Sequence, residues 1–362
     1  MVHFLKLFQY VLLDLLVVLS LSGCSHSTDI DATEVPTASS VPTGIMQEDE
    51  QEDYEIKGNT VYLNRTTSLF YVKAEGAETM IIDGGVGLED INLDPMGDHI
   101  VPTYDSYFRG CPNIKRIEVT DGTFQKGEAN GGLFAEDNML MYNIPKKGVY
   151  ACPVTKEGKI KIPKGTWEIY DCAFQRCEKI EEVVIPASVR WVGDAAFGYN
   201  TGCRKISVDK DSKYLKSVDG VLYTKDGKVL LAYPAGKKDT EFRVPDGVQY
   251  IADGAFMGAV KLKQVSLPKN LYYIGEKVFM DCKNLEKVSP GEKVTFIMKS
   301  AYENCPKLEF QNCPKKKKYS NTWDVALVET NGRTSWESNY KYLAYMETEY
   351  RWKAMYHYLG GE

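Results

Sequence analysis

The apolar residues of this sequence recur with a period of 23 residues over the middle of the chain. The pattern is clearest when the repeats are aligned on one aromatic position, the anchor, which falls at Phe108, Phe174, Phe197, Phe256, Phe279 and Tyr302. Further apolar residues follow most anchors at three, six, nine and eleven places, and others precede most of them at five and eight. A unit this short cannot bury its apolar side alone, so the spacing predicts a solenoid of stacked coils.

Two elements are expected in each coil. Around nine to eleven residues after the anchor, apolar and polar residues alternate, which predicts a short β-strand. Around the anchor itself, apolar residues stand three apart, which predicts a helical turn. The expected fold class is therefore α/β but rich in β-structure.

Two longer gaps between anchors contain a second repeated pattern. The segments that begin at Gly131 and Gly220 share the sequence form Gly-x-Leu-x-x-x-Asp and reach a proline, Pro145 or Pro234, after 14 residues. The second segment alternates apolar residues on both sides of Asp226-Gly227, a pair typical of tight turns. Both segments are predicted to be β-hairpin-like inserts.

These residues resemble a known family. The strings IPASVRWVGDAAF, VPDGVQYIADGAFMGAVKLKQVSLP and LPKNLYYIGEKVFMDCKNLEKV resemble the BspA-like leucine-rich repeats of bacterial surface proteins. The resemblance covers residues 98–313 and weakens at Asn200, Ala259 and the coil after Tyr302. It implies a curved, right-handed solenoid with short parallel strands, and a role in adhesion or protein–protein interaction.

The N-terminus has the form of an export signal. Residues 1–23 contain Lys6 and then an apolar run that is shorter than the roughly 20 residues of a transmembrane helix. The run ends in Leu-Ser-Gly before Cys24, which resembles the lipobox of bacterial lipoproteins, whose cysteine carries the acyl chains. The prediction is a lipoprotein signal peptide, with Cys24 as the lipid attachment site on the outer face of a bacterial membrane. The alternative is an ordinary secretory signal followed by a chance cysteine.

Residues 24–57 are predicted to form a disordered acidic tether. Between residues 25 and 57 there are nine acidic side chains and one lysine, which give a net charge of -8. The whole chain has a net charge of -6, so the remainder of the chain is slightly basic. Without a basic patch, and with an export signal, a nucleic-acid partner is not expected.

Both ends of the repeat region are expected to be covered. Residues 58–97 contain strand-like runs and are predicted to cap the first coil. In residues 314–362, a capping-box sequence at Thr334–Glu337 predicts a helix that ends near Leu359. This helix is predicted to cap the last coil, with a partner-binding element as the alternative.

No catalytic motif or metal-binding pattern occurs in the sequence, and no cofactor is expected. Only His99 and His357 offer acid–base chemistry outside the signal and tether. Four cysteines share the position three residues after an anchor, and they are predicted to be small buried core residues: Cys111, Cys177, Cys282 and Cys305. A disulfide between Cys282 and Cys305 stays open, because neighbouring coils stack at about 4.8 Å.

A row of aromatic residues six places before the anchors is the candidate ligand-binding surface. The row is expected to face outward, because its neighbours in the pattern face the core; it comprises Trp191, Tyr250, Tyr273 and Phe296, with Tyr272 beside it. The leading hypothesis is non-enzymatic binding of an extracellular protein, from a host matrix or the cell envelope. The alternatives are glycan binding by the aromatic row and, third, an extracellular hydrolase formed by residues 58–97 and the C-terminal segment.

Overall fold

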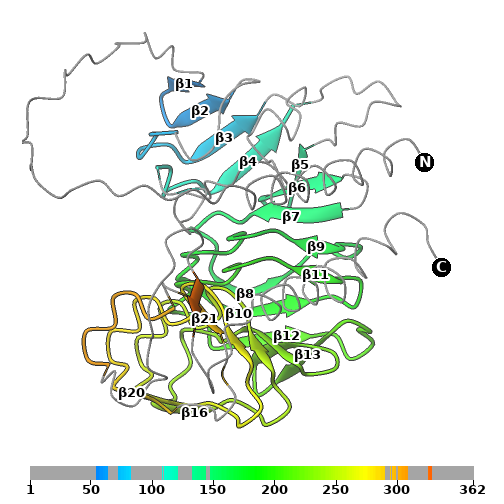
Figure 1. Ribbon diagram of the computed structural model, residues 1–362. Coiled ribbons are helices and arrows are strands. Elements are labelled where there is room, and N and C mark those ends of the chain that lie inside the picture. The colour runs from blue at the N-terminus through cyan, green and yellow to red at the C-terminus, as the bar shows by residue number, and fades with distance from the viewer. Residues whose placement is uncertain are drawn as a thin grey trace, which may run out of the picture. The chain divides into compact units, whose positions relative to one another are not determined.

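The computed structural model describes most of the repeat region and parts of its flanks (Figure 1). The described residues are 54–63, 72–82, 108, 110–120, 133–143, 147–289, 294, 296–298, 301–308 and 325–327. The chain divides into two units, Met1–Glu50 and Gln51–Glu362, and every described residue belongs to the second. The signal segment, most of the tether and the expected C-terminal helix lie outside the described residues.

The longer strand of each coil lies about nine residues after the anchor, as the alternation predicts. Neighbouring strands pair in parallel at the 23-residue spacing, so that Glu182 lies opposite Lys205 and Val265 lies opposite Val288. The strands form two three-stranded sheets: β8 (Gly158–Lys161), β10 (Ile180–Ile185) and β12 (Lys205–Val208) in one, and β16 (Glu241–Arg243), β18 (Gln264–Ser266) and β20 (Lys287–Ser289) in the other. The predicted solenoid is confirmed, and it makes about eight turns.

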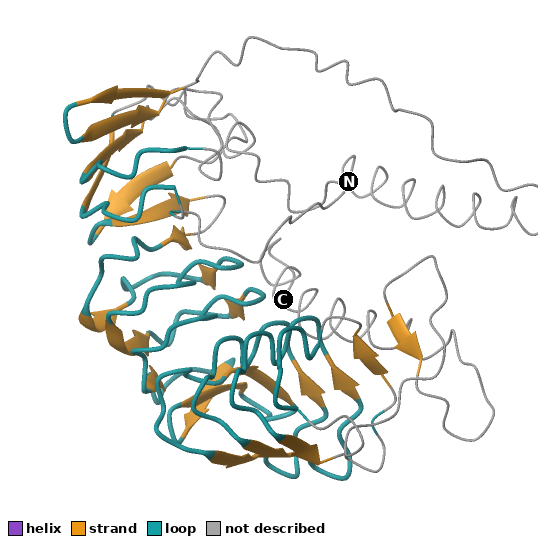
Figure 2. Ribbon diagram, turned by 90° about the vertical axis from the view of Figure 1, so that its left-hand side faces the viewer, coloured by secondary structure: helices purple, strands orange, loops and turns teal. Residues whose placement is uncertain are grey.

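A second and shorter strand precedes each anchor from Phe174 onward and forms another side of the stack (Figure 2). These strands also pair in parallel between coils: β9 (Glu168–Ile169) with β11 (Trp191–Val192), and β17 (Tyr250–Ile251) with β19 (Tyr273–Ile274) and β21 (Phe296–Met298). At Gly193, which follows β11, a side chain would meet the Asp171 carboxylate at 2.1 Å. That carboxylate accepts a hydrogen bond from the Asp194 amide at 2.7 Å, so glycine permits a polar link between coils here.

The ladder of longer strands begins earlier in the chain than the sequence pattern indicated. Strands β2 (Thr60–Leu63), β3 (Thr79–Ile82) and β4 (Arg116–Val119) pair in parallel, so part of the expected cap region continues the stacking. Strand β1 (Tyr54–Lys57) pairs antiparallel with β2. The last four residues of the expected tether are therefore ordered by backbone pairing, although three of the four side chains are exposed.

Both predicted hairpins are confirmed, and each contributes a third strand. The first insert contains β5 (Leu133–Glu136), β6 (Met139–Asn143) and β7 (Lys147–Ala151), and the second contains β13 (Leu215–Val218), β14 (Val221–Thr224) and β15 (Val229–Ala232). The second insert turns at Asp226-Gly227, where Gly227 has a φ of 80°. The last strand of each insert then joins the short-strand ladder in parallel, β7 with β9 and β15 with β17. At the far end, β22 (Val325–Leu327) pairs antiparallel with β21.

The helical turn expected around each anchor is wrong. Residues two places before and after the anchors Phe174, Phe197, Phe256 and Phe279 have positive φ, and they include Cys172 and Arg176 in one coil and Gly254 and Gly258 in another. Residues of positive and negative φ therefore alternate around the anchor, and backbone amides point toward the next coil. The Phe174 amide, for example, donates to the Ala196 carbonyl at 2.8 Å. In a helix these amides would donate to carbonyls of the same segment. Here hydrogen bonding between coils outweighs the helical preference of the local sequence. No residue that the structure describes is helical, and hence none forms a helix long and apolar enough to cross a membrane.

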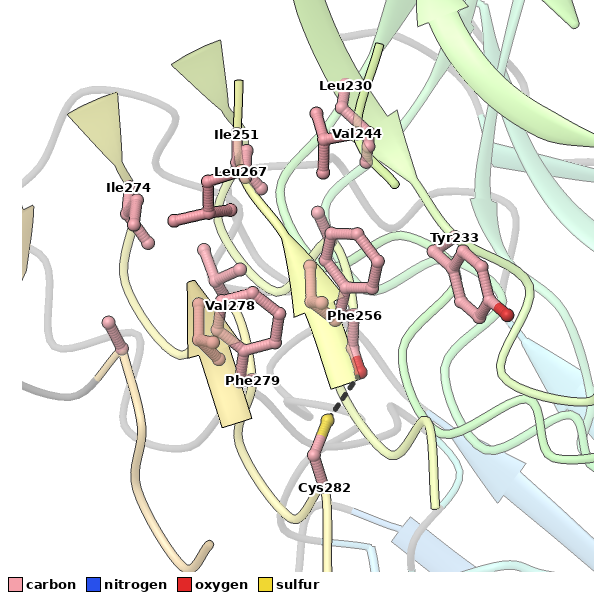
Figure 3. Packing of buried hydrophobic residues seen from close by; sticks show 14 of the residues in the cluster. Leu230, Tyr233, Val244, Ile251, Phe256, Leu267, Ile274, Val278, Phe279 and Cys282 are labelled. Atoms are coloured by element: carbon pink, nitrogen blue, oxygen red, sulfur yellow. Dashed lines mark hydrogen bonds between the residues drawn. The ribbon is translucent and has the colours of Figure 1, made fainter. Parts of the chain in front are cut away.

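The anchor rings stack along the core of the solenoid. Phe256 and Phe279 lie with ring centroids 5.0 Å apart, and Tyr302 continues the column 5.5 Å beyond Phe279. Tyr233 extends it on the other side, 5.0 Å from Phe256 (Figure 3). The sequence pattern missed Tyr233 as an anchor because it ends a hairpin insert. All ten predicted core residues are buried, namely the six anchors and Cys111, Cys177, Cys282 and Cys305.

Truncating one anchor should destabilise the whole stack. We expect Phe279→Ala to lower the free energy of unfolding by about 3–5 kcal/mol, because a fully buried ring is replaced by a cavity between two others. Urea or thermal unfolding followed by circular dichroism measures this loss. Lys283→Ala, at an exposed position four residues away, is the control, and about 0.5 kcal/mol or less is expected. An equal effect of both substitutions would contradict the role of the ring column.

Candidate functional site

The aromatic row lies on the short strands as expected, but much of it is covered. Tyr250, Tyr273 and Phe296 lie opposite one another in consecutive strands. Tyr273 is only 5% exposed and Trp191 is 9% exposed, so the expectation that the row faces outward is wrong for both. Tyr273 lies on a middle strand, where in-register neighbours on both sides restrict access to its ring.

Tyr250 and Tyr272 are the partly exposed members of the aromatic row. Their rings make an edge-to-face contact, with centroids 6.0 Å apart. Burial, and then the neighbouring Tyr272 hydroxyl, raise the pKa of Tyr250. The Phe296 side chain lies outside the described part of the chain. The candidate ligand-binding role of this row therefore stays a prediction, and Tyr250 and Tyr272 are its accessible part.

A cationic contact that the sequence did not indicate lies near Trp191. The Arg190 guanidinium lies 5.1 Å from the centre of the Trp167 ring and 4.8 Å from that of Tyr214. The three residues come from two successive coils and the start of an insert, so no local spacing identifies them. Stacking between two rings fixes this arginine and makes it a structural element.

The cysteines three places after the anchors have a shared hydrogen-bonding role. The Cys282 thiol donates to the Phe256 carbonyl at 3.2 Å, and the Cys305 thiol donates to the Phe279 carbonyl at 2.9 Å, each reaching into the preceding coil. All seven described cysteines are free thiols. Burial raises the pKa of Cys282 well above its usual range and that of Cys111 to about 11. These thiols are weak nucleophiles in the folded chain.

The longer strands present a polar face that is partly exposed. On β10, Glu182 lies between two lysines, 3.0 Å from Lys159 and 3.8 Å from Lys205. A hydrogen bond from Ser207, and then Lys159, hold the pKa of Glu182 below its usual range. The same strand face carries Gln264, Ser266 and Lys287 in the second sheet. Such a surface suits a polar protein partner better than an apolar ligand.

A hollow of about 380 Å³ opens beside β12, where the first sheet ends. Its lining comes from β12 and from the turn between β13 and β14, and includes Arg204, Lys205, Ser217 and Gly220. The sequence did not single out this position, because the insert brings residues together that are more than ten places apart.

Several candidates from the sequence cannot be assigned a place. Cys24, His99 and His357 lie outside the described residues. Within the described residues, no three His, Cys, Asp or Glu side chains are placed to hold a metal ion.

The repeats match a known family model. The model of the BspA type leucine rich repeat region matches six copies, over residues 142–218 and 235–323. No curated protein matches the chain. Among solved structures, the chain is similar to a leucine-rich repeat protein from Eubacterium ventriosum, at 20% identity and a TM-score of 0.40, over 69% of this chain and 72% of that one. It is also similar to a leucine rich cell surface protein from Faecalibacterium prausnitzii, at 16% identity and a TM-score of 0.35, over 77% of this chain and 90% of that one.

The buried thiols should resist alkylation while the chain is folded. With the pKa of Cys111 and Cys203 raised to about 11, only about one thiol in a thousand is ionised at pH 8. We expect iodoacetamide at pH 8 to leave Cys111, Cys177, Cys203, Cys282 and Cys305 unlabelled, as read by peptide mass spectrometry. The same reagent in guanidinium chloride should label all five. Rapid labelling of Cys282 in the folded chain would contradict its burial.

Proposed function

Because this chain contains a BspA-type leucine-rich-repeat region, we propose that it is an exported, lipid-anchored protein whose solenoid binds another protein outside the membrane. The observation that carries the proposal is the partly exposed, polar face of the longer strands, supported from beneath by buried apolar residues. A rigid array of this kind offers many polar side chains at fixed spacing, which suits recognition of a protein surface.

The proposed anchor rests on the N-terminal sequence. An apolar run is followed by Leu21-Ser22-Gly23-Cys24, and a lipobox at this position would place acyl chains on Cys24. The acidic segment that follows would repel an anionic bilayer and hold the repeats away from it. The lipid anchor, the acidic spacer and the binding domain then follow one another in the order that a surface receptor requires.

A non-enzymatic role agrees with the chemistry of the described residues. Their thiols have raised pKa values and donate hydrogen bonds to backbone carbonyls, which is a structural use. The polar groups of the strand face are spread along the stack and do not converge on one point.

Glycan binding is the second candidate function. The partly exposed ring pair of Tyr250 and Tyr272 favours it, because sugar rings stack on accessible aromatic faces. Two rings give a much smaller platform than the five-residue row predicted from the sequence. Protein binding is therefore the preferred function.

Replacing the lipid-carrying residue should release the protein from the membrane. We expect Cys24→Ala to move the chain from the membrane fraction to the soluble or secreted fraction, and to abolish metabolic labelling with palmitate. Ser22→Ala, a conservative change two residues away, is the matched control and should leave the protein in the membrane fraction. Unchanged fractionation of Cys24→Ala would refute the lipid anchor.

The two binding functions make opposite demands on the tyrosine pair. We expect the double variant Tyr250→Ala, Tyr272→Ala to bind protein partners within about twofold of the unaltered chain, as measured with immobilised host-matrix and envelope proteins. Tyr273→Ala is the structural control, because loss of that buried ring should lower the free energy of unfolding by about 3–5 kcal/mol. A glycan array signal that the double variant loses by tenfold or more, with no protein binding, would instead support the glycan function.

A further inference from the structure

The ladder of longer strands is interrupted between β12 and β16. Within residues 147–289, β12 is the last strand of one sheet and β16 is the first strand of the next. The turn of the β13–β14 hairpin occupies the first part of this break, where the Ile206 amide donates to the Gly220 carbonyl at 2.9 Å. The Lys237 ammonium donates to the Asp219 carbonyl at 2.8 Å and fixes the turn from the other side.

The second part of the β12 edge is open. On β12 the amides of alternate residues face β10, as the bond from Asp209 to the Ile185 carbonyl shows. Val208 consequently turns its N–H and C=O toward the break, and no strand among the described residues pairs with β12 on that side. An edge with unpaired backbone groups is a template for one more extended segment. The hollow of about 380 Å³ lies at this edge and includes Val208 in its wall.

The same hollow has an excess of positive charge. The Arg204 side chain is exposed and has no ion-pair or hydrogen-bond partner among the described residues. Lys205 lies only loosely beside Glu182, at 3.8 Å, whereas Ser207 and Lys159 hold that carboxylate more closely, at 2.7 and 3.0 Å. Asp219 is the one acidic residue in the wall. The surrounding stretch, residues 147–289, has 24 basic and 18 acidic side chains, a net charge of +6.

We propose that this hollow is a docking site for an extended, acidic segment of the partner protein. The segment would pair its backbone with Val208 and place a carboxylate between Arg204 and Lys205. The backbone pairing favours a peptide over an anionic glycan, because a glycan has no regular series of amides to offer. This inference rests on the proposed protein-binding function and names the surface and the partner chemistry.

Synthetic peptides test the site on the full chain in detergent. The probe is a fluorescein-labelled octapeptide of alternating threonine and glutamate, followed by fluorescence anisotropy. We expect saturable binding that weakens with added salt, and no binding of the matching threonine–lysine peptide. The acidic peptide with alternate amides N-methylated should bind at least tenfold more weakly, because it loses strand pairing on one edge.

Charge reversal locates the binding. We expect Arg204→Glu to weaken binding of the acidic peptide about tenfold or more. Arg243→Glu is the matched control, since Arg243 is an exposed arginine on β16, in the other sheet, and should change the affinity less than twofold. Thermal unfolding checks that both variants are folded.

Three results would overturn the site: no binding of the acidic peptide, equal loss in both arginine variants, or equal binding of the N-methylated peptide. Displacement of the peptide by an anionic polysaccharide at lower concentrations would also overturn it, in favour of a glycan. A partner protein that binds the Arg204→Glu chain normally would reject this site while leaving the proposed function intact. Failure of the membrane-anchor and protein-binding measurements, by contrast, would reject the function itself.

Discussion

The structure depends on hydrogen bonds between one coil and the next, made in register around each coil. The longer strands, the short strands and the turns at the anchors all pair backbone amides with carbonyls of a neighbouring coil. A coil therefore has few partners within itself and is stable only as part of a stack. This constraint keeps the spacing at 23 residues wherever three coils follow one another without an insert.

The side chains of the core follow from that register. Anchor rings stack about 5 Å apart because each sits on the same position of its coil. Cysteine suits the position three residues later because its thiol is small enough to be buried and still donates to a carbonyl of the preceding coil. Where the inserts leave the period, the ladder is interrupted, and unpaired backbone groups and unneutralised charges reach the surface. The proposed docking site beside β12 is thus a consequence of the irregularities in the repeat.

The regular part of this architecture could be predicted and the irregular part could not. The six anchors, the strand after each of the first five and the turn at Asp226-Gly227 follow from periodic spacing and turn chemistry. The expected helical turn failed because spacing by threes fits both a helix and a run of alternating turns, and only the neighbouring coil decides between them. Tyr273 was expected to be exposed, but the register covers it on both sides. Tyr233 went unrecognised because its coil is preceded by an insert.

The sequence by itself determined the period, the identity of the buried columns and the division of charge between an acidic N-terminal segment and a basic repeat region. These properties are local or periodic, so they can be read from one copy of the pattern. Only the tertiary structure decided which residues meet across coils, such as Tyr199 and Asp281, 82 residues apart, or Ser217 and the Ile206 carbonyl. Those contacts depend on how many residues each insert adds and on which coil it then rejoins. The geometry of stacking decides which coil an insert rejoins and therefore which residues meet. No local pattern of apolar and polar residues predicts these contacts.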